Sequence, residues 1–134
     1  MIRATPYGHQ ALAETYRAKG MFTEALAEYG RAEDLGWHAA RTGRALTLAQ
    51  MGNAAEARRL ARELEEESTR QYVAPDWIAV VYVQLGDKEA AFSWLQRALE
   101  ARSMWVASKN LPDWDPIRGD PRFAAILRRM GLRP

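Results

Sequence analysis

The chain repeats one pattern at intervals of 32 and 34 residues, and three glycines mark it: Gly20, Gly52 and Gly86. A small residue precedes each glycine by seven positions and another follows it by five; these are Ala13, Ala45 and Ala79, then Ala25, Ala57 and Ala91. Small residues on both sides of a glycine turn let two helices approach closely, and a period near 34 residues is typical of stacked helical hairpins. Because such arrays work by presenting a surface, we expect this protein to bind a partner.

The composition favours a soluble globular protein. Of the 134 residues, 48% are apolar and 27% are charged, and the net charge is +2. The longest uncharged apolar run, residues 77–85, is far shorter than the ~20 residues that span a bilayer, and residues 1–6 lack the apolar core of a secretory signal. Cysteine is absent, which leaves no disulfide or thiolate metal site and favours a reducing compartment. We therefore expect one core and a cytoplasmic location.

Capping residues predict the first hairpin. Thr5 and Pro6 begin a helix that runs to about Ala18. Thr23 is the expected cap of the second helix, and Gly36 ends that helix in the left-handed conformation that glycine adopts at no steric cost.

The second hairpin is expected from a helix over about residues 37–51 and a second helix begun by a capping box of Asn53 and Glu56. One face of that second helix should be buried, at Ala57, Leu60, Ala61 and Leu64. Its other face is interpreted as a solvated surface, made of Arg58, Arg59, Arg62, Glu63, Glu65, Glu66 and Glu67.

The third hairpin begins at Pro75, turns at Gly86 and continues in a helix capped by Asp87. Its apolar stripe is Ala91, Trp94, Leu95, Ala98 and Leu99. Residues 103–119 read as a partly irregular segment held by Trp105, Leu111, Trp114 and Ile117. A last helix starts at Asp120-Pro121, runs through Phe123, Ile126, Leu127 and Met130, and stops at Gly131. This helix is expected to cover the end of the stack.

These residues resemble the tetratricopeptide repeat (TPR) family. The first repeat, about residues 6–39, matches through Leu12-Ala13, Tyr16, Gly20, Glu24-Ala25, Tyr29 and Ala32; the third, about 72–105, matches through Ile78-Ala79, Tyr82, Leu85-Gly86-Asp87, Ala91, Leu95 and Ala98. The second, about 38–71, departs from the pattern, with Arg44 in place of a leucine and Leu64 in place of a small residue. The resemblance implies one all-α domain over residues 1–134. Its fold would be a right-handed superhelix of three helical hairpins with a C-terminal cap over about 106–134.

The last sixty residues resemble a narrower group, the terminal TPR segment of bacterial multidomain regulators that carry cyclase, kinase or winged-helix modules. The motifs are Tyr72 to Ala79, Asp115-Pro116-Ile117-Arg118, Asp120-Pro121-Arg122-Phe123 and residues 127–132. The resemblance implies a sensing or docking role for this part of the chain.

Catalytic and metal-binding patterns are missing from the sequence. The two histidines, His9 and His38, have no second ligand at helical spacing and are interpreted as surface residues. The sequence contains no glycine-rich phosphate loop and no serine elbow. We therefore expect neither enzymatic activity nor a metal or other cofactor.

Five tryptophans are candidates for a ligand pocket: Trp37, Trp77, Trp94, Trp105 and Trp114. Packing accounts for Trp94 on an apolar stripe, and for Trp105 and Trp114 as covers of the stack. Trp77 stays open between packing and binding, because the TPR resemblance places it on the concave face.

The resemblance also implies which residues line the concave groove. They are Tyr7, Gln10, Glu14 and Arg17 from the first repeat, Thr42, Leu46 and Gln50 from the second, and Val73, Asp76, Trp77, Val80 and Gln84 from the third. The basic clamp with which chaperone-binding TPR domains hold a carboxylate is missing, since its positions hold Gln10, Glu14, Gly43, Val73 and Trp77. We expect a peptide or partner helix with one apolar anchor against Val73, Trp77 and Val80, flanked by neutral or basic groups.

Two other functions remain open. The exposed flank of the first helix or the last helix could form a homodimer. The C-terminal arginines, Arg118, Arg122, Arg128, Arg129 and Arg133, could instead contact nucleic acid. We interpret them in the first place as a solvated outer face.

Overall fold

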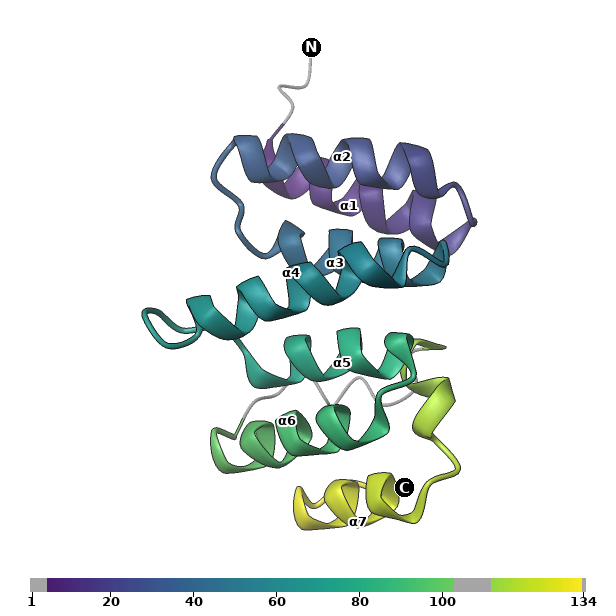
Figure 1. The fold of residues 1–134 in the computed structure, drawn as a ribbon, viewed down its shortest axis with the longest axis vertical. Helices are drawn as coiled ribbons and strands as arrows, with labels where there is room; N and C mark the ends of the chain where they lie inside the picture. The colour runs from purple at the N-terminus through teal and green to yellow at the C-terminus, as the bar shows by residue number, and fades with distance from the viewer. Residues whose placement is uncertain (1–4, 103–111, 134) are drawn as a thin grey trace. The chain divides into compact units, whose positions relative to one another are not determined.

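The computed structural model describes residues 5–102 and 112–133, and these residues form α-helices and one 3-10 helix but no strand (Figure 1). In chain order the elements are α1 (Pro6–Ala18), α2 (Phe22–Asp34), α3 (Ala40–Gln50), α4 (Ala54–Glu67), α5 (Pro75–Leu85), α6 (Lys88–Glu100), the 3-10 helix η2 (Pro112–Ile117) and α7 (Pro121–Arg129). The all-α prediction is confirmed. Trp105 and Leu111, expected to hold the irregular segment, lie outside the described residues. No helix in the described ranges has the length and apolar character that crossing a membrane requires.

The three glycine turns share one hydrogen-bonding pattern. Gly20, Gly52 and Gly86 all have left-handed backbones, with φ of 77°, 88° and 78°. The residue after each glycine donates its backbone N–H to a carbonyl five positions earlier: Met21 to Tyr16, Asn53 to Leu48, and Asp87 to Tyr82, at 2.9, 2.9 and 3.0 Å. This bond satisfies a carbonyl that the end of the helix leaves free. The sequence repeat is therefore also a repeat of structure.

Three predicted helix starts are confirmed by their caps. The hydroxyl of Thr5 accepts from the N–H of Gly8 at 2.9 Å at the start of α1. Asp87 caps α6 and Asp120 caps α7 in the same manner. Proline occupies the first turn of α1, α5 and α7, where its missing N–H costs no helical bond.

Two other starts differ from the prediction. Thr23 does not cap α2, because the N–H of Ala25 already bonds to the carbonyl of Met21 at 3.0 Å and the helix begins at Phe22. Residues 37–39 form a turn, so α3 begins at Ala40 rather than near residue 37.

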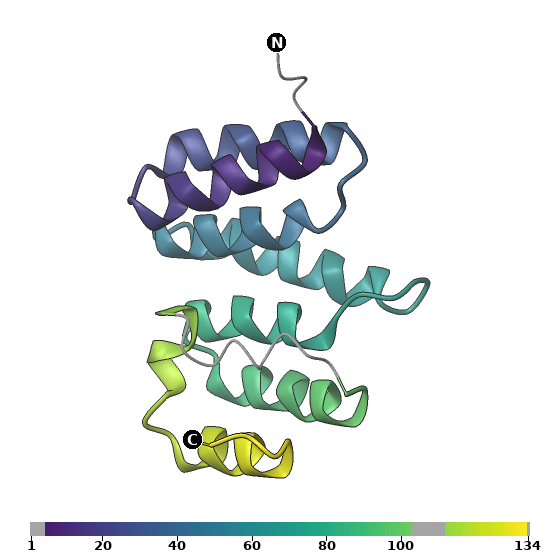
Figure 2. The ribbon, with the colours of Figure 1, turned by 180° about the vertical axis from the view of Figure 1, so that it is seen from behind.

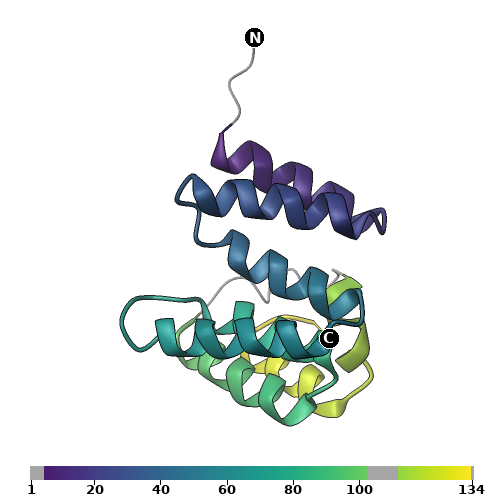
Figure 3. The same ribbon diagram turned by 45° about the horizontal axis from the view of Figure 1, so that its top comes forward.

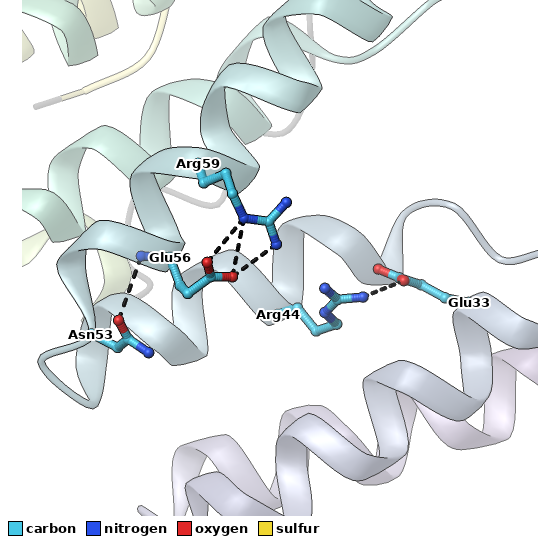
Figure 4. A network of polar contacts seen from close by, with 5 residues as sticks. All are labelled: Glu33, Arg44, Asn53, Glu56 and Arg59. Carbon is cyan, nitrogen blue, oxygen red and sulfur yellow. Dashed lines mark hydrogen bonds and ion pairs between the residues drawn. The ribbon is translucent and has the colours of Figure 1, made fainter.

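The expected capping box at the start of α4 is only half formed (Figure 4). The N–H of Glu56 donates to Asn53 Oδ1 at 3.4 Å, which is the expected half. The carboxylate of Glu56 accepts three bonds from Nε and Nη2 of Arg59 instead of returning to the N–H of Asn53. The guanidinium lies one turn ahead and offers a charge-assisted bond, which is stronger than a bond to a neutral amide.

The chain divides into two compact units, residues 1–60 and residues 61–134, so that α4 contributes to both. In unit 1, α1 pairs with α2 (Figure 3), and α1 and α3 lie on the side turned to the viewer in Figure 2. Its core contains Ala13, Ala25, Tyr29, Ala32 and Ala40, with Tyr16 packed against them. The assignment of the whole chain to one domain stays a prediction.

Unit 2 is built around α5, whose apolar side chains are buried on all sides from Ile78 to Val83. Helices α6 and η2 pack on α5, and α7 packs on α6. Phe123, Ile126 and Leu127 of α7 are buried, and the ring of Phe123 stacks on Trp114 with centroids 5.9 Å apart. The last helix thus buries its apolar face, as predicted.

Candidate protein-interaction surface

Unit 1 brings together most of the groove residues predicted for the first two repeats. Along α1, the amide of Gln10 donates to Glu14 at 2.9 Å. Between α1 and α3, Arg17 Nη1 donates to Gln50 Oε1 at 3.5 Å. We call these four side chains the polar track; they come from α1 and α3, the two helices of unit 1 that are turned to the viewer in Figure 2.

A buried tyrosine holds the end of this track. Arg17 Nε donates to the hydroxyl of Tyr29 at 3.3 Å, and Tyr29 is only 1% exposed. The guanidinium is therefore oriented by the core of unit 1 as well as by Gln50. Thr42 and Leu46 of α3 are buried, so they support this surface and are not accessible parts of it.

The other end of the surface is aromatic. Tyr7 is 69% exposed, and its ring meets the ring of Trp37 edge to face, with centroids 6.4 Å apart and planes at 86°. Trp37 was a pocket candidate on aromatic count but had no place among the predicted groove residues. Trp37 directly follows the turn glycine Gly36, at the expected start of a helix, and no signal in the sequence indicates that it would contact Tyr7.

On unit 2 the predicted groove residues are largely covered. Asp76 and Val80 of α5 are buried, and Val73 and Trp77 are half-buried. Gln84 donates its amide to the backbone carbonyl of Asp113 at 2.7 Å, and so binds the chain's own η2 segment. A ligand on this face would reach Val73 and Trp77 but not Val80.

The η2 segment explains why that end of α5 is closed. Trp114 and Ile117 of η2 are 0% and 1% exposed, and η2 packs directly on α5. The packing role predicted for Trp114 agrees with this burial. The segment lies where the third repeat would otherwise offer its first helix to a peptide.

The interpretation of His9 as a surface residue is wrong. Its Nδ1 lies 2.6 Å from Glu28 Oε2, and the His9 side chain is only 16% exposed. Glu28 also pairs with Arg31, which leaves a compact polar cluster between α1 and α2. His38 is exposed, as predicted. Within residues 5–102 and 112–133, no three His, Cys, Asp or Glu side chains are grouped so that they could hold a metal ion.

The interpretation of the α4 outer face as solvated is wrong at Glu65. Its Oε1 accepts from the hydroxyl of Tyr82 at 2.5 Å and from the indole N–H of Trp94 at 3.1 Å. One carboxylate thus joins α4, α5 and α6 within unit 2. The packing role predicted for Trp94 agrees with this bond and with Arg97, which lies 4.2 Å above the Trp94 ring.

The departure of the second repeat from the family pattern has a structural reason. Arg44 stands on α3 where a leucine is usual, and its Nη1 lies 2.5 Å from Glu33 Oε2 on α2 (Figure 4). Both side chains are largely buried, so the ion pair lies within the contact between α2 and α3. Close by, the bond from Arg59 holds the pKa of Glu56 below its usual value.

The C-terminal arginines are mostly engaged by the chain itself. Arg118 pairs with Asp115 at 3.0 Å, and Arg129 donates to Gln96 at 3.4 Å. Arg122 pairs with Asp120 at 3.0 Å and with Glu89 at 2.8 Å, and these bonds raise its pKa. The bonds from Arg122 lower the pKa of Asp120. Two of these arginines, Arg118 and Arg122, are thus paired with carboxylates, and Arg122 and Arg129 connect α7 to α6.

Comparison with protein-family models matches residues 76–103 to the tetratricopeptide repeat. The matched span covers nearly all of α5 and α6, the hairpin that contains Gly86. Comparison with curated proteins and with solved structures gave no match. The third hairpin is thus similar to a tetratricopeptide repeat, and the whole described chain has the all-α hairpin architecture expected for such an array.

Proposed function

We propose that this protein is a protein–protein interaction module without catalytic activity, which binds a peptide or a partner helix on the α1–α3 face of unit 1. The observation that carries the proposal is the threefold recurrence of one hairpin, together with the tetratricopeptide match over its third copy. Tetratricopeptide repeats generally mediate contacts between proteins.

The α1–α3 face suits this role because its accessible side chains differ in chemistry and lie over the buried residues Thr42 and Leu46. It offers the exposed aromatic ring of Tyr7 at one end and the amide of Gln50 at the other, with the carboxylate of Glu14 between them along α1. Aromatic side chains and arginine are the residue types that contribute most binding energy at protein interfaces. On unit 2, Val73 and Trp77 form a second, smaller contact area in the proposal.

The proposed cellular setting follows from the sequence. The likeness of the last sixty residues to the ends of bacterial multidomain regulators favours a role in docking a regulatory assembly, in the cytoplasm. Self-association is the second candidate, favoured by Leu12 on α1, which is 48% exposed. Nucleic-acid binding has less support, because Arg118, Arg122 and Arg129 bond to neighbouring side chains.

Site-specific photo-crosslinking tests the proposal. A benzoylphenylalanine replaces Gln50 on the proposed face, or Ser93 on the exposed surface of α6 as the matched control, in the full chain expressed in its native host. We expect one discrete protein to crosslink from position 50 and not from position 93. Equal crosslinking from both positions, or none from position 50, would contradict the proposal. A crosslink between two copies of this chain would replace it with self-association.

A further inference from the structure

We propose that the Tyr7–Trp37 pair receives a cationic side chain, arginine or lysine, from the bound protein segment. This inference rests on the proposed interaction function and names the chemistry of the partner at one end of the α1–α3 face. It is carried by the geometry of the two rings and by the charges around them.

The two rings are available and correctly arranged for a cation. An edge-to-face pair presents two π surfaces at nearly a right angle, and the planes of Tyr7 and Trp37 meet at 86°. Tyr7 is 69% and Trp37 is 39% exposed, so a side chain can reach both from solvent. Cations are attracted to the negative faces of such rings, and tryptophan is the strongest of the aromatic acceptors.

The same chain already uses this contact elsewhere. Arg97 lies 4.2 Å above the ring of Trp94, and Arg122 lies 4.2 Å above the ring of Phe92. Arg97 comes from the same helix α6 as Trp94, whereas Arg122 comes from α7 and Phe92 from α6. The Tyr7–Trp37 pair offers an equivalent surface with greater exposure.

The charge around the pair complements a basic ligand. Glu14 lies two turns beyond Tyr7 on the same side of α1, since residues seven apart share a helix face. Asp34 precedes Trp37 by three residues at the end of α2. Both carboxylates are exposed, and among the described residues neither is paired with a basic side chain. An arginine on the rings would therefore share this end of unit 1 with two carboxylates that no basic side chain of the described residues pairs.

Two basic groups on the helices of this face, Arg17 and Arg44, are held by other side chains of unit 1. Arg17 is at the opposite end of α1, where Tyr29 and Gln50 hold it. Arg44 is paired with Glu33. Glu14 and Asp34 therefore favour a cationic ligand at the aromatic end. Arg41, four residues after Trp37 in α3, is engaged within the chain.

The test uses two capped heptapeptides as probes, Gly-Ser-Arg-Ala-Arg-Ser-Gly and Gly-Ser-Glu-Ala-Glu-Ser-Gly, added to the isotope-labelled full chain. The readout is the indole N–H signal of Trp37 in two-dimensional NMR, assigned with Trp37→Phe. We expect the arginine peptide to shift this signal saturably, and the shift to weaken as salt is raised. We expect the glutamate peptide to leave the signal unchanged.

Matched variants separate the rings from general surface effects. Tyr7→Leu should weaken binding of the arginine peptide about two- to fivefold, which is the loss of affinity expected for one exposed cation–π contact. Tyr72→Leu removes a tyrosine of similar exposure, 76%, from unit 2 and should leave binding of the arginine peptide unchanged. Glu14→Gln should weaken binding and reduce its salt dependence.

Three results would overturn the inference. They are an equal response to the glutamate peptide, a response to the arginine peptide that Tyr7→Leu leaves intact, and a Trp37 signal that moves with protein concentration alone. The last result would mean that a second copy of this chain occupies the pair. If position 50 still crosslinks a partner while the arginine peptide fails, only this inference falls. If both fail, the proposed function falls with it.

Discussion

The ring of Tyr29 occupies the space where a side chain at Gly43 would begin. A Cβ built on Gly43 would lie 2.2 Å from Cε1 and 2.4 Å from Cζ of that ring. Tyr29 is 1% exposed, and its hydroxyl accepts from Arg17, so both core packing and this hydrogen bond hold the ring in place. The close approach of α2 and α3 in unit 1 therefore depends on a glycine in mid-helix, and the same contact orients Arg17 on the proposed binding face.

Replacing this glycine should destabilise the protein. Alanine favours helix over glycine by about 1 kcal/mol, but overpacking a fixed ring costs ~1–3 kcal/mol, and we expect the steric cost to win at Gly43→Ala. Gly30→Ala is the matched control, because Gly30 lies within α2 and has nothing within 4 Å of its Cβ direction. Urea unfolding should show a loss for Gly43→Ala and a small gain for Gly30→Ala. Equal effects at the two positions would contradict the packing described for Tyr29.

Glu65 should matter more than its neighbours in the glutamate run. Glu65→Ala removes the acceptor of two partly buried donors, the Tyr82 hydroxyl and the Trp94 indole N–H, and a loss of this kind costs about 1–3 kcal/mol. Glu65→Gln keeps a carbonyl acceptor and should cost less. Glu66→Ala, at an exposed position one residue later, should change the free energy of unfolding by less than about 0.5 kcal/mol. Thermal or urea unfolding ranks the three variants. Similar losses of stability for Glu65→Ala and Glu66→Ala would contradict the role of Glu65 in joining α4, α5 and α6.

Acid should selectively weaken the start of α7. The pKa of Asp120 is lowered in the folded chain by its bonds with Arg122, so its stabilisation is fully present above the ordinary carboxyl range and is lost as pH falls through the lowered pKa. Asp120→Asn keeps a capping oxygen without the charge. The melting temperature of the wild type should exceed that of the variant at pH 7, and the gap should close from about pH 4 downward. A gap that is independent of pH, or that survives unchanged in an Arg122→Gln background, would show that the charge of Asp120 is not the cause.

Removing α7 should expose the core of unit 2. Deletion of residues 119–134 uncovers Trp114, which is fully buried against Phe123. We expect the melting temperature to fall by roughly 5 °C or more, with aggregation visible by light scattering. Deletion of residues 133–134 alone is the control and should have little effect. An unchanged melting temperature in the longer deletion would mean that α7 contributes nothing to unit 2.

Local signals in the sequence were sufficient for the helical hairpins. Gly20, Gly52 and Gly86 and the caps at Thr5, Asp87 and Asp120 depend on residues within one turn, so their residue types alone indicate them. The prediction that Thr23 caps α2 was wrong although threonine is a favourable capping residue. The helix already begins at Phe22, where the N–H of Ala25 bonds to the carbonyl of Met21.

The parts that could not be predicted depend on contacts between distant residues. Glu65 lies in a run of four glutamates in five residues, and only the packing of α5 and α6 brings Tyr82 and Trp94 to it. The position of Gln84 in its repeat is that of a groove residue. No pattern within the repeat indicates that its side-chain amide donates to the backbone carbonyl of residue 113. Trp37 could not be placed beside Tyr7 because the turn before α3 sets its direction. The groove residues on unit 1 remain a prediction that only a bound partner can test.

Hydrogen exchange with the partner identified by crosslinking tests the account most directly. Backbone amides of the full chain would be compared with and without that partner at saturating concentration. The account predicts increased protection over residues 6–18 and 37–50 of unit 1, with α6 and α7 unchanged. Protection confined to α6 or α7, with no change along α1 and α3, would contradict the assignment of the α1–α3 face as the binding surface.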